Sequence, residues 1–294
     1  MKRVQILLSS YKGQSYIEEQ INSILTQVNV DIHILIRDDG SDDDTIPIIK
    51  KYNDPRITII EGQNIGATKS FFELIRISGD AEYYAFSDQD DVWDSDKLIS
   101  AIDILNKFAE IPAIYSSNTR LVDKQLQFLK NENKSPNTTL GSALIKNYAT
   151  GCTIVFNHEL MKYLKRNTNI VVPYHDWWVN LVALSIGGVS LYDNTPHISY
   201  RQHDNNVVGS QKNFFKKWTD RAFRYRTTQY HRDLMAKELI RIYHDKLDDK
   251  SKDILNIFAD EKSKVIDFLR NRNIKTSNTI DNIMFFILVV TNKL

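Results

Sequence analysis

The chain has 294 residues, with 38 lysines and arginines against 37 aspartates and glutamates, which gives a formal net charge of +1. This near-zero balance gives no sign of a nucleic-acid-binding protein. Hydrophobic residues at 42% and charged residues at 26% are typical of a globular chain and exclude a disordered one. The single cysteine excludes an intramolecular disulfide framework and a cysteine-cluster metal site.

Strand-like sequence begins at Val4 without a charged and then apolar leader before it, which argues against secretion. The longest apolar run, residues 283–290, is shorter than the roughly 18 residues that a membrane-spanning helix needs. We therefore expect a cytoplasmic protein. Peripheral contact with the inner face of the cell membrane is compatible with this expectation.

Strand and helix patterns alternate through the first part of the chain. Strand patterns occur at residues 4–8, 31–36, 57–60 and 83–86, and helix patterns at 15–26, 45–52, 66–77 and 95–108. This alternation predicts an α/β fold, a mostly parallel sheet flanked by helices. Ligands of such sheets bind beyond the carboxyl ends of the strands.

The pattern becomes mixed after about residue 110. Residues 153–156 and 197–200 resemble strands, and residues 176–186 resemble a helix. From residue 211 onward the chain is helical in pattern and rich in lysine and arginine. We predict a first domain at residues 1–210 and a helical C-terminal region at 211–294.

An acidic cluster follows the strand at residues 83–86: Asp88, Asp90 and Asp91 lie within four positions. Like charges this close are costly unless a positive charge offsets them, and Mg²⁺ or Mn²⁺ binds carboxylates together with substrate phosphates. The alternative is a solvated acidic turn or a helix cap. The position of the cluster at a strand end favours the metal site.

Two phosphate-binding motifs are excluded by spacing. Lys69 lies three residues beyond Gly66, whereas a P-loop lysine directly follows its second glycine, and no G-x-G-x-x-G sequence follows the first strand. The turn at Asp38 and Asp39 is a weak signal by itself, because Asp-Gly turns are common.

Asp176 stands at the start of a helix pattern beside Trp177 and Trp178. An aspartate there is often only a helix cap, but an aromatic wall beside it suits a sugar ring, and desolvation would raise its pKa toward that of a general base. A metallohydrolase His-Asp pair is the other reading of His175 and Asp176, and its further ligands are missing. Arg201 and His203 follow a short strand pattern. They either supply positive charge beside a metal-diphosphate site or belong to a polar loop without a function.

Seven motifs in this order resemble family 2 glycosyltransferases with the GT-A fold, in the bacterial surface-polysaccharide branch that includes many rhamnosyltransferases. The motifs are Leu8-Ser9-Ser10-Tyr11, Asp38-Asp39-Gly40-Ser41, Asn64-Ile65-Gly66, Ser87-Asp88-Gln89-Asp90-Asp91-Val92-Trp93, Thr150-Gly151-Cys152, His175-Asp176-Trp177 and Tyr200-Arg201-Gln202-His203. The resemblance covers about residues 1–210. It implies metal-dependent, inverting sugar transfer from a nucleotide sugar to a glycan or a polyprenyl-diphosphate-linked acceptor.

The same resemblance implies residue roles. Asp176 takes the position of the catalytic base, and Asp90 and His203 take positions that bind or approach the metal. Contacts to the nucleotide sugar are expected from Ser9, Tyr11, Asp39, Asn64, Lys69, Asp88, Gly151, Trp177 and Arg201. The family often has Glu-Asp where this chain has His175-Asp176, which leaves the role of His175 open.

The expected donor is dTDP-L-rhamnose, with a UDP-hexose second, and the expected pathway is cell-surface polysaccharide or capsule synthesis. A nucleotidyltransferase and a non-catalytic partner subunit stay as alternatives. Two C-terminal segments have an interaction pattern: residues 212–232 interleave basic and aromatic side chains, and residues 283–290 are apolar. This pattern fits a lipid surface, a homodimer contact or packing on the catalytic domain. No nucleic-acid partner is expected.

Overall fold

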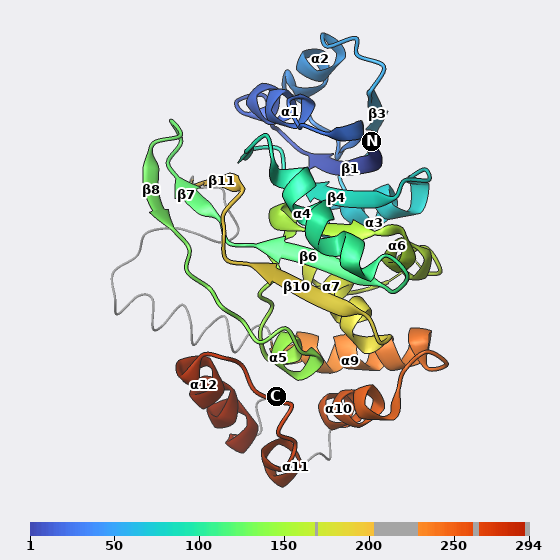
Figure 1. The fold of residues 1–294 in the computed structure, drawn as a ribbon, viewed down its shortest axis with the longest axis vertical. Helices are drawn as coiled ribbons and strands as arrows, with labels where there is room; N and C mark the ends of the chain where they lie inside the picture. Colours follow the sequence, from blue (N-terminus) through green and yellow to red (C-terminus); the bar gives the residue numbers. More distant parts are fainter. Residues whose placement is uncertain (168–169, 203–228, 261–264, 292–294) are drawn as a thin grey trace.

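The computed structural model describes residues 1–167, 170–202, 229–260 and 265–291 (Figure 1). At its centre lies a seven-stranded sheet in the order β10-β6-β9-β4-β1-β2-β3. The strands are β1 (Lys2–Ser10), β2 (Val30–Asp38), β3 (Ile57–Glu61), β4 (Tyr83–Ser87), β6 (Ala113–Ser117), β9 (Val155–Asn157) and β10 (Val189–Asp193). All pairs are parallel except those of β9, which runs antiparallel to β4 and β6. The predicted α/β fold is confirmed.

Helices cover both faces of the sheet because the strands are apolar on both sides. Val4, Ile6 and Leu8 of β1 belong to one buried cluster, and Leu7 belongs to another. The first cluster includes side chains of α1 (Ile17–Leu25), α2 (Thr45–Lys50) and α4 (Lys97–Leu105). The second includes side chains of α3 (Ala67–Ile77), α6 (His158–Leu164) and α7 (His175–Ser185).

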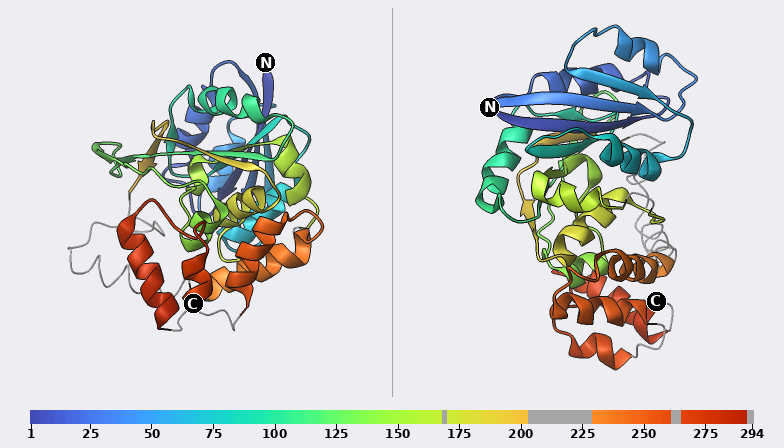
Figure 2. Two further views of the ribbon diagram at one scale, coloured as in Figure 1. Left: turned by 60° about the horizontal axis from the view of Figure 1, so that its bottom comes forward. Right: turned by 90° about the vertical axis from the view of Figure 1, so that its right-hand side faces the viewer.

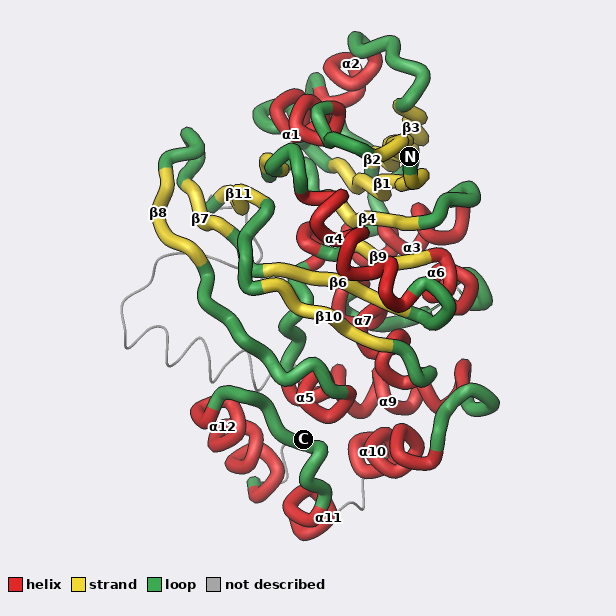
Figure 3. Tube along the Cα trace, viewed as in Figure 1, coloured by secondary structure: helices red, strands yellow, loops and turns green. Residues whose placement is uncertain are grey.

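A smaller sheet in the order β5-β11-β7-β8 lies beside the main one (Figure 3). Its strands are β5 (Val92–Trp93), β7 (Arg120–Val122), β8 (Phe128–Asn131) and β11 (Ile198–Arg201). Two short helices belong to the main layer: η1 (Asn106–Phe108) follows α4, and η2 (Gly151–Thr153) contacts β4, β6 and α7. Because β5 directly follows the acidic cluster and pairs with β11, the register brings Ser199 opposite Val92. Residues far apart in sequence thus meet next to Asp91.

The C-terminal helices form one end of the molecule, away from β1, β2 and β3 (Figure 2). They are α9 (Gln229–Tyr243), α10 (Asp249–Ala259), α11 (Val265–Arg270) and α12 (Thr279–Val290), and α5 (Leu140–Ile145) lies next to them. Met235, Leu255 and Phe285 share one buried cluster with α5 and α7. The predicted boundary after residue 210 falls outside the described residues.

The described helices include none that combines the length and the apolar composition needed to cross a bilayer. Most of the basic and aromatic segment at residues 212–232 lies outside the described residues. Arg232 is described, and it is buried at 3% exposure. Its guanidinium donates to the carbonyl oxygens of Leu144 and Ile145 and lies over the Trp177 ring. The structure therefore gives Arg232 a packing role and excludes it from a lipid-facing surface.

Candidate active site

Three parallel strands end at one edge of the main sheet. Ser10 at the end of β1 pairs in register with Asp38 at the end of β2, and Leu8 pairs with Ser87 at the end of β4. The Ser10 hydroxyl donates to Asp38 Oδ2 over 2.9 Å. The polar residues that follow these strands therefore gather at the edge where ligands of α/β sheets bind.

Gln89 joins the acidic turn after β4 to the loop after β1. Its Oε1 accepts the Tyr11 backbone N–H over 2.8 Å, and its Nε2 donates to the Tyr11 carbonyl oxygen over 2.9 Å. A Cβ on Gly13 would lie less than 3.0 Å from Gln89 Oε1, so a larger residue at position 13 would displace the end of the Gln89 side chain. Sequence reasoning missed Gln89 as a site residue, although it lies inside the acidic motif.

Asp38 and Asp39 have different tasks in the turn after β2. Asp38 accepts the backbone N–H groups of Gly40 and Ser41 and thereby shapes the turn. Asp39, at 2% exposure, forms a 2.5 Å ion pair with Arg37 and accepts the N–H groups of Ile65 and Gly66, each over 2.9 Å. Arg37 is thus a buried partner that the sequence did not single out. Asp39 holds the loop at residues 62–66 against the site.

Burial raises the pKa of Asp88 to about 7, and the charges of Asp90 and Asp176 add to the rise. Asp91 is fully buried, its pKa is also raised by burial and by Asp90 and Asp88, and its Oδ2 has no hydrogen-bond partner among the described residues. Asp88, Asp91 and Cys152 each place a ligand atom within 4.8 Å of the other two. The thiol pKa is raised by burial, so Cys152 stays protonated.

The buried Lys97 side chain supplies positive charge near Asp91. Two neighbouring carboxylates, one of them with a buried oxygen that accepts no hydrogen bond among the described residues, fit a hard divalent cation such as Mg²⁺ or Mn²⁺. The group that the structure brings together contains Asp91, a member of the acidic cluster to which the resemblance gave no role of its own. Asp90 contributes its backbone carbonyl oxygen to Arg201 Nε over 2.8 Å. His203, the other expected metal ligand, lies outside the described residues.

Asp176 lies in the first turn of α7, and its carboxylate is held on both sides. Its Oδ1 accepts the Trp177 backbone N–H over 2.7 Å, and its Oδ2 accepts from Asn147 Nδ2 over 3.1 Å. Burial raises its pKa to about 6, against the opposing effect of these hydrogen bonds. Asn147 follows α5 in sequence, and no motif marked it as a site residue.

The acidic cluster and Asp176 belong to one site. The charge of Asp176 contributes to the raised pKa of Asp88. The short helix η2 links the two groups: a Cβ on Gly151 would lie 3.5 Å from Asp176 Cβ, while the next residue, Cys152, lies beside Asp88 and Asp91. Gly151 and Cys152 therefore lie between Asp176, the expected base, and the carboxylates Asp88 and Asp91.

His175 cannot act as an acid at neutral pH. Its ring stacks on Phe71 at 3.9 Å between centroids and meets Phe86 edge-on at 5.1 Å. Burial lowers its pKa to about 3, so the imidazole stays neutral. We conclude that His175 packs behind Asp176 and sets the position of the first turn of α7.

Other expected donor contacts divide into exposed and buried residues. Tyr11, Asn64 and Lys69 are exposed, and the Ser9 hydroxyl donates to Ser70 Oγ over 2.7 Å. Trp177 is 3% exposed and its Nε1 donates to the Ala143 carbonyl oxygen, so its ring packs in the core next to Asp176.

Arg201 lies against the acidic turn. It is 2% exposed, its guanidinium contacts Glu19, the Lys124 carbonyl oxygen and the Asp90 carbonyl oxygen, and it lies 4.7 Å from the Tyr16 ring centroid. A guanidinium with these partners holds the backbone of the acidic turn.

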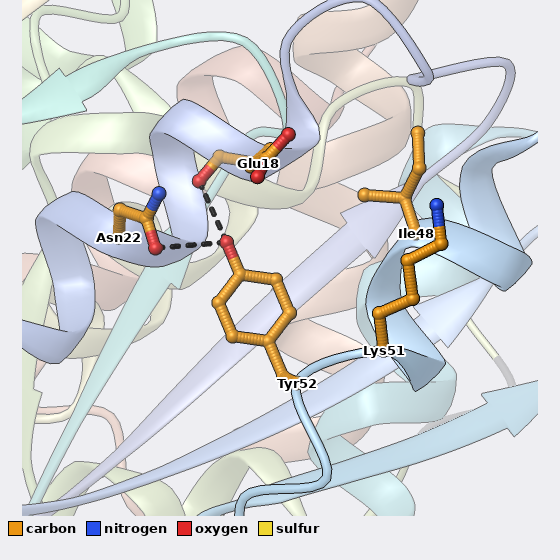
Figure 4. Close-up of a pocket in the computed structure, with 5 residues that line it drawn as sticks. All are labelled: Glu18, Asn22, Ile48, Lys51 and Tyr52. Atoms are coloured by element: carbon orange, nitrogen blue, oxygen red, sulfur yellow. Dashed lines mark hydrogen bonds between the residues drawn. The ribbon is translucent and has the colours of Figure 1, made fainter.

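A separate pocket lies between α1 and α2 and shares no residue with this site (Figure 4). Glu18, Asn22, Ile48, Lys51 and Tyr52 line it. The Tyr52 hydroxyl donates to one of two oxygens, the Glu18 carbonyl at 3.0 Å or Asn22 Oδ1 at 2.9 Å. Its side chains bind one another, so we assign it no role in the chemistry.

Residues 5–165, more than half of the chain, match the family described as glycosyl transferase family 2. The chain belongs to this family. It is therefore a glycosyltransferase that uses a nucleotide-sugar donor, and the enzyme class predicted from the motifs is confirmed. The main sheet, with its polar edge after β1, β2 and β4, is the GT-A arrangement that the resemblance implied.

Two curated relatives match this glycosyltransferase over most of its length. The dTDP-rhamnosyl transferase RfbG of Shigella flexneri is 33% identical over 231 residues, which cover 72% of this chain and 76% of RfbG. WfaP of Escherichia coli, a UDP-Glc:alpha-D-GlcNAc-diphosphoundecaprenol beta-1,3-glucosyltransferase, is 28% identical over 218 residues, covering 72% of this chain and 82% of WfaP. The rhamnosyltransferase-like branch is thus confirmed.

Solved structures share the fold at low sequence identity. S. aureus TarS 1-349, in complex with UDP-GlcNAc, superposes with a TM-score of 0.55 at 16% identity, over 93% of this chain and 88% of that one. The mannosyltransferase PcManGT from Pyrobaculum calidifontis, in complex with GDP-Man and Mn²⁺, has a TM-score of 0.55 at 18% identity, over 92% of this chain and 71% of that one.

Proposed function

We propose that this glycosyltransferase transfers L-rhamnose from dTDP-L-rhamnose, with inversion and with a bound divalent cation, to a glycan or polyprenyl-diphosphate-linked acceptor. The observation that carries the chemical proposal is the convergence of Asp176 with Asp88 and Asp91 on η2: a Cβ on Gly151 would lie 3.5 Å from Asp176 Cβ, and the next residue, Cys152, has its ligand atom within 4.8 Å of those of Asp88 and Asp91. The relationship to RfbG supports the donor, and the relationship to WfaP makes a UDP-hexose the second choice and supports a lipid-linked acceptor.

Asp176 is the proposed general base. With a pKa of about 6 it is ionised at neutral pH, yet more basic than an ordinary aspartate. The acceptor oxygen bonds to the anomeric carbon as its proton passes to Asp176. The bond from that carbon to the diphosphate oxygen breaks on the opposite face, and its electron pair leaves with the nucleoside diphosphate. One displacement of this kind inverts the anomeric centre.

Asp88 and Asp91 would hold the cation, with Asp90 and His203 as the further ligands that the family resemblance implies. When bound, a divalent cation supplies positive charge that stabilises the departing diphosphate. Arg201 and Gln89 fix the backbone of this turn from two sides. The carboxylates therefore need little rearrangement when a ligand binds.

The nucleoside end of the donor would lie over the loops after β1, β2 and β3. We assign base and ribose contacts to Ser9, Tyr11 and the remaining lone pair of Asp39, and further contacts to Asn64 and Gly151. Lys69 is exposed at the first turn of α3 and would approach a phosphate. We place the reaction in the cytoplasm, in the synthesis of a cell-surface polysaccharide or capsule.

The donor assignment is tested by thermal unfolding of the purified enzyme with Mn²⁺ and one nucleotide sugar at a time. We expect dTDP-L-rhamnose to raise the melting temperature most, since a ligand at a hundred times its Kd stabilises by about 2.7 kcal/mol. A larger shift with UDP-glucose would overturn the rhamnose assignment in favour of the hexose.

Product analysis separates this proposal from its rivals. A glycosyltransferase releases dTDP, whereas a nucleotidyltransferase releases pyrophosphate. A non-catalytic partner subunit releases neither, even from slow hydrolysis of the donor. We expect dTDP alone, formed only when a divalent cation is present.

A further inference from the structure

Helix α12 presents a largely apolar face to solvent, in which Thr279 is the one exposed polar side chain. Five of its side chains are large, apolar and between 43% and 53% exposed, namely Ile280, Ile283, Phe286, Ile287 and Val290. At about 100° per residue these positions span roughly a 120° arc of the helix. The only charged residue of α12, Asp281, is 3% exposed and ion-paired with Lys146 at 2.7 Å.

A second apolar face of α12 already packs against the protein. Phe285, Leu288 and Val289 are at most 8% exposed, and Phe285 contacts Phe258 and Phe268 through their rings. The helix is thus held in place by its inner face, and its outer face is not needed for the core. A surface helix that faced only water would normally carry charged or polar side chains there.

The neighbouring helix α11 adds to this surface. Ile266 and Leu269 are 43% and 58% exposed. Together α11 and α12 hold seven of the sixteen large apolar side chains that are exposed in the described part of the chain. Both helices lie at the same end of the molecule in Figures 1 and 2.

From the last residue of α11 to the first residue of α12, every charged side chain is positive. Arg270, Arg272 and Lys275 are exposed, and no acidic residue occurs between Asp267 and Asp281. Apolar side chains flanked by cations complement a membrane surface that contains anionic lipids. The apolar side chains enter the boundary below the headgroups, and the cations bind the lipid phosphates. A second protein copy would bring the same cations close to each other, which is unfavourable.

We propose that the α11–α12 surface, made of these seven apolar and three basic side chains, docks the enzyme on the anionic face of a lipid bilayer. Docking of this kind holds the enzyme at the surface without spanning the membrane. It does not depend on the chemistry at Asp176, so the two can fail separately.

Sedimentation of the full-length protein with vesicles tests the proposal. We expect binding to vesicles of equal parts phosphatidylcholine and phosphatidylglycerol, and much weaker binding to phosphatidylcholine alone. Replacing Ile283 and Ile287 together by serine should weaken binding about tenfold or more, because two of the inserted side chains are lost. The combined change of Arg270, Arg272 and Lys275 to glutamine should weaken it about 100-fold, at roughly fivefold per cation.

The matched control replaces Phe128 and Leu129 by serine, two exposed apolar side chains on β8, and should leave vesicle binding unchanged. Each variant should keep the wild-type melting temperature and the wild-type rate of donor hydrolysis without lipid. Two results would overturn the proposal: no binding to either vesicle, or binding that the α12 variant does not weaken. A dimer in solution that the Ile283 and Ile287 changes convert to monomer would show that a second copy covers the face, and would overturn it too.

Discussion

The Asp176 carboxylate owes its basicity to burial and its ionisation to its neighbours. Burial raises its pKa to about 6, while the Trp177 backbone N–H and Asn147 oppose the rise by donating to the charged form. A free aspartate is ionised but weakly basic, and a fully desolvated one would hold its proton at neutral pH. A pKa of about 6 suits a carboxylate that is deprotonated before the reaction and accepts a proton during it.

The first prediction concerns pH. A protonated Asp176 cannot accept the acceptor's proton, so kcat/KM should be constant above about pH 7 and fall about tenfold per unit below pH 6. Replacing Asn147 by alanine removes a hydrogen bond that favours the charged form and should move this limb to higher pH. Steady-state rates across the pH range measure both effects. A profile without an acidic limb would contradict the role of Asp176.

The second prediction concerns stability. The pKa of Asp88 is raised to about 7, so its folded form prefers to be protonated, and its effect on stability becomes unfavourable as pH rises from about 4 toward 7. Asp88→Asn should therefore stabilise the cation-free enzyme at pH 7.5 by roughly 1–3 kcal/mol. At pH 4 the gain should vanish. Denaturant unfolding at both pH values tests this, and a destabilised variant at pH 7.5 would contradict it.

The sequence pointed to the acidic cluster because it follows a strand, and to Asp176 because it begins a helix beside two tryptophans. It did not find Gln89, Arg37 or Asn147, and it did not predict the hydrogen-bond partners of Arg201. Their roles depend on hydrogen bonds across large sequence separations, such as Asn147 to Asp176 or Arg201 to Glu19, which no local pattern encodes. Burial decides whether an arginine faces a ligand or the protein, and burial follows from packing.

At the scale of elements, periodicity predicted the strands and helices of the N-terminal half to within a few residues. The prediction worked because β1 and β2 are buried on both faces and their helices are amphipathic, as in α1 and α3. After β6 the strands are short and β9 runs antiparallel, so the periodicity that marks a strand is brief. The pairing of β11 with β5 depends on tertiary contacts.

The third prediction tests the contact of α5 with the segment before α12. A Cβ on Gly141 would lie less than 3.0 Å from the backbone oxygen of Asn273, so Gly141→Ala forces backbone movement and should cost roughly 1–3 kcal/mol. In a helix without this contact the same change would stabilise by roughly 0.5–1 kcal/mol. Gly79→Ala is the control, because a Cβ there would have Gln5 Nε2, at 3.9 Å, as its nearest neighbour. Equal melting temperatures for both variants would refute the contact.

At the scale of the whole molecule, the C-terminal helices support the active site from behind. Arg232 of α9 donates to the carbonyl oxygens of Leu144 and Ile145, the last residues of α5. Asn147, which orients Asp176, follows two residues later. The helices at one end of the chain thus help to fix a side chain that takes part in the proposed chemistry.

The fourth prediction follows from this support. Arg232→Met leaves two buried carbonyl oxygens without their donor and should cost roughly 2–4 kcal/mol of stability, with a reduced kcat. Lys237→Met is the matched control on α9, because its 3.3 Å ion pair with Asp233 is exposed and should contribute less than about 0.5 kcal/mol. Denaturant unfolding and single-turnover rates measure the pair of variants. An unchanged stability for Arg232→Met would contradict the support.

The most direct test of the central claim separates donor binding from turnover in Asp176→Asn. If Asp176 is the base in a site that it shares with the cation ligands, calorimetry with Mn²⁺ should give donor affinity close to that of the wild type. Turnover should fall on the order of 10²–10⁴-fold. Asp90→Ala should instead weaken the cation-dependent affinity. Near-normal turnover in Asp176→Asn would contradict the account.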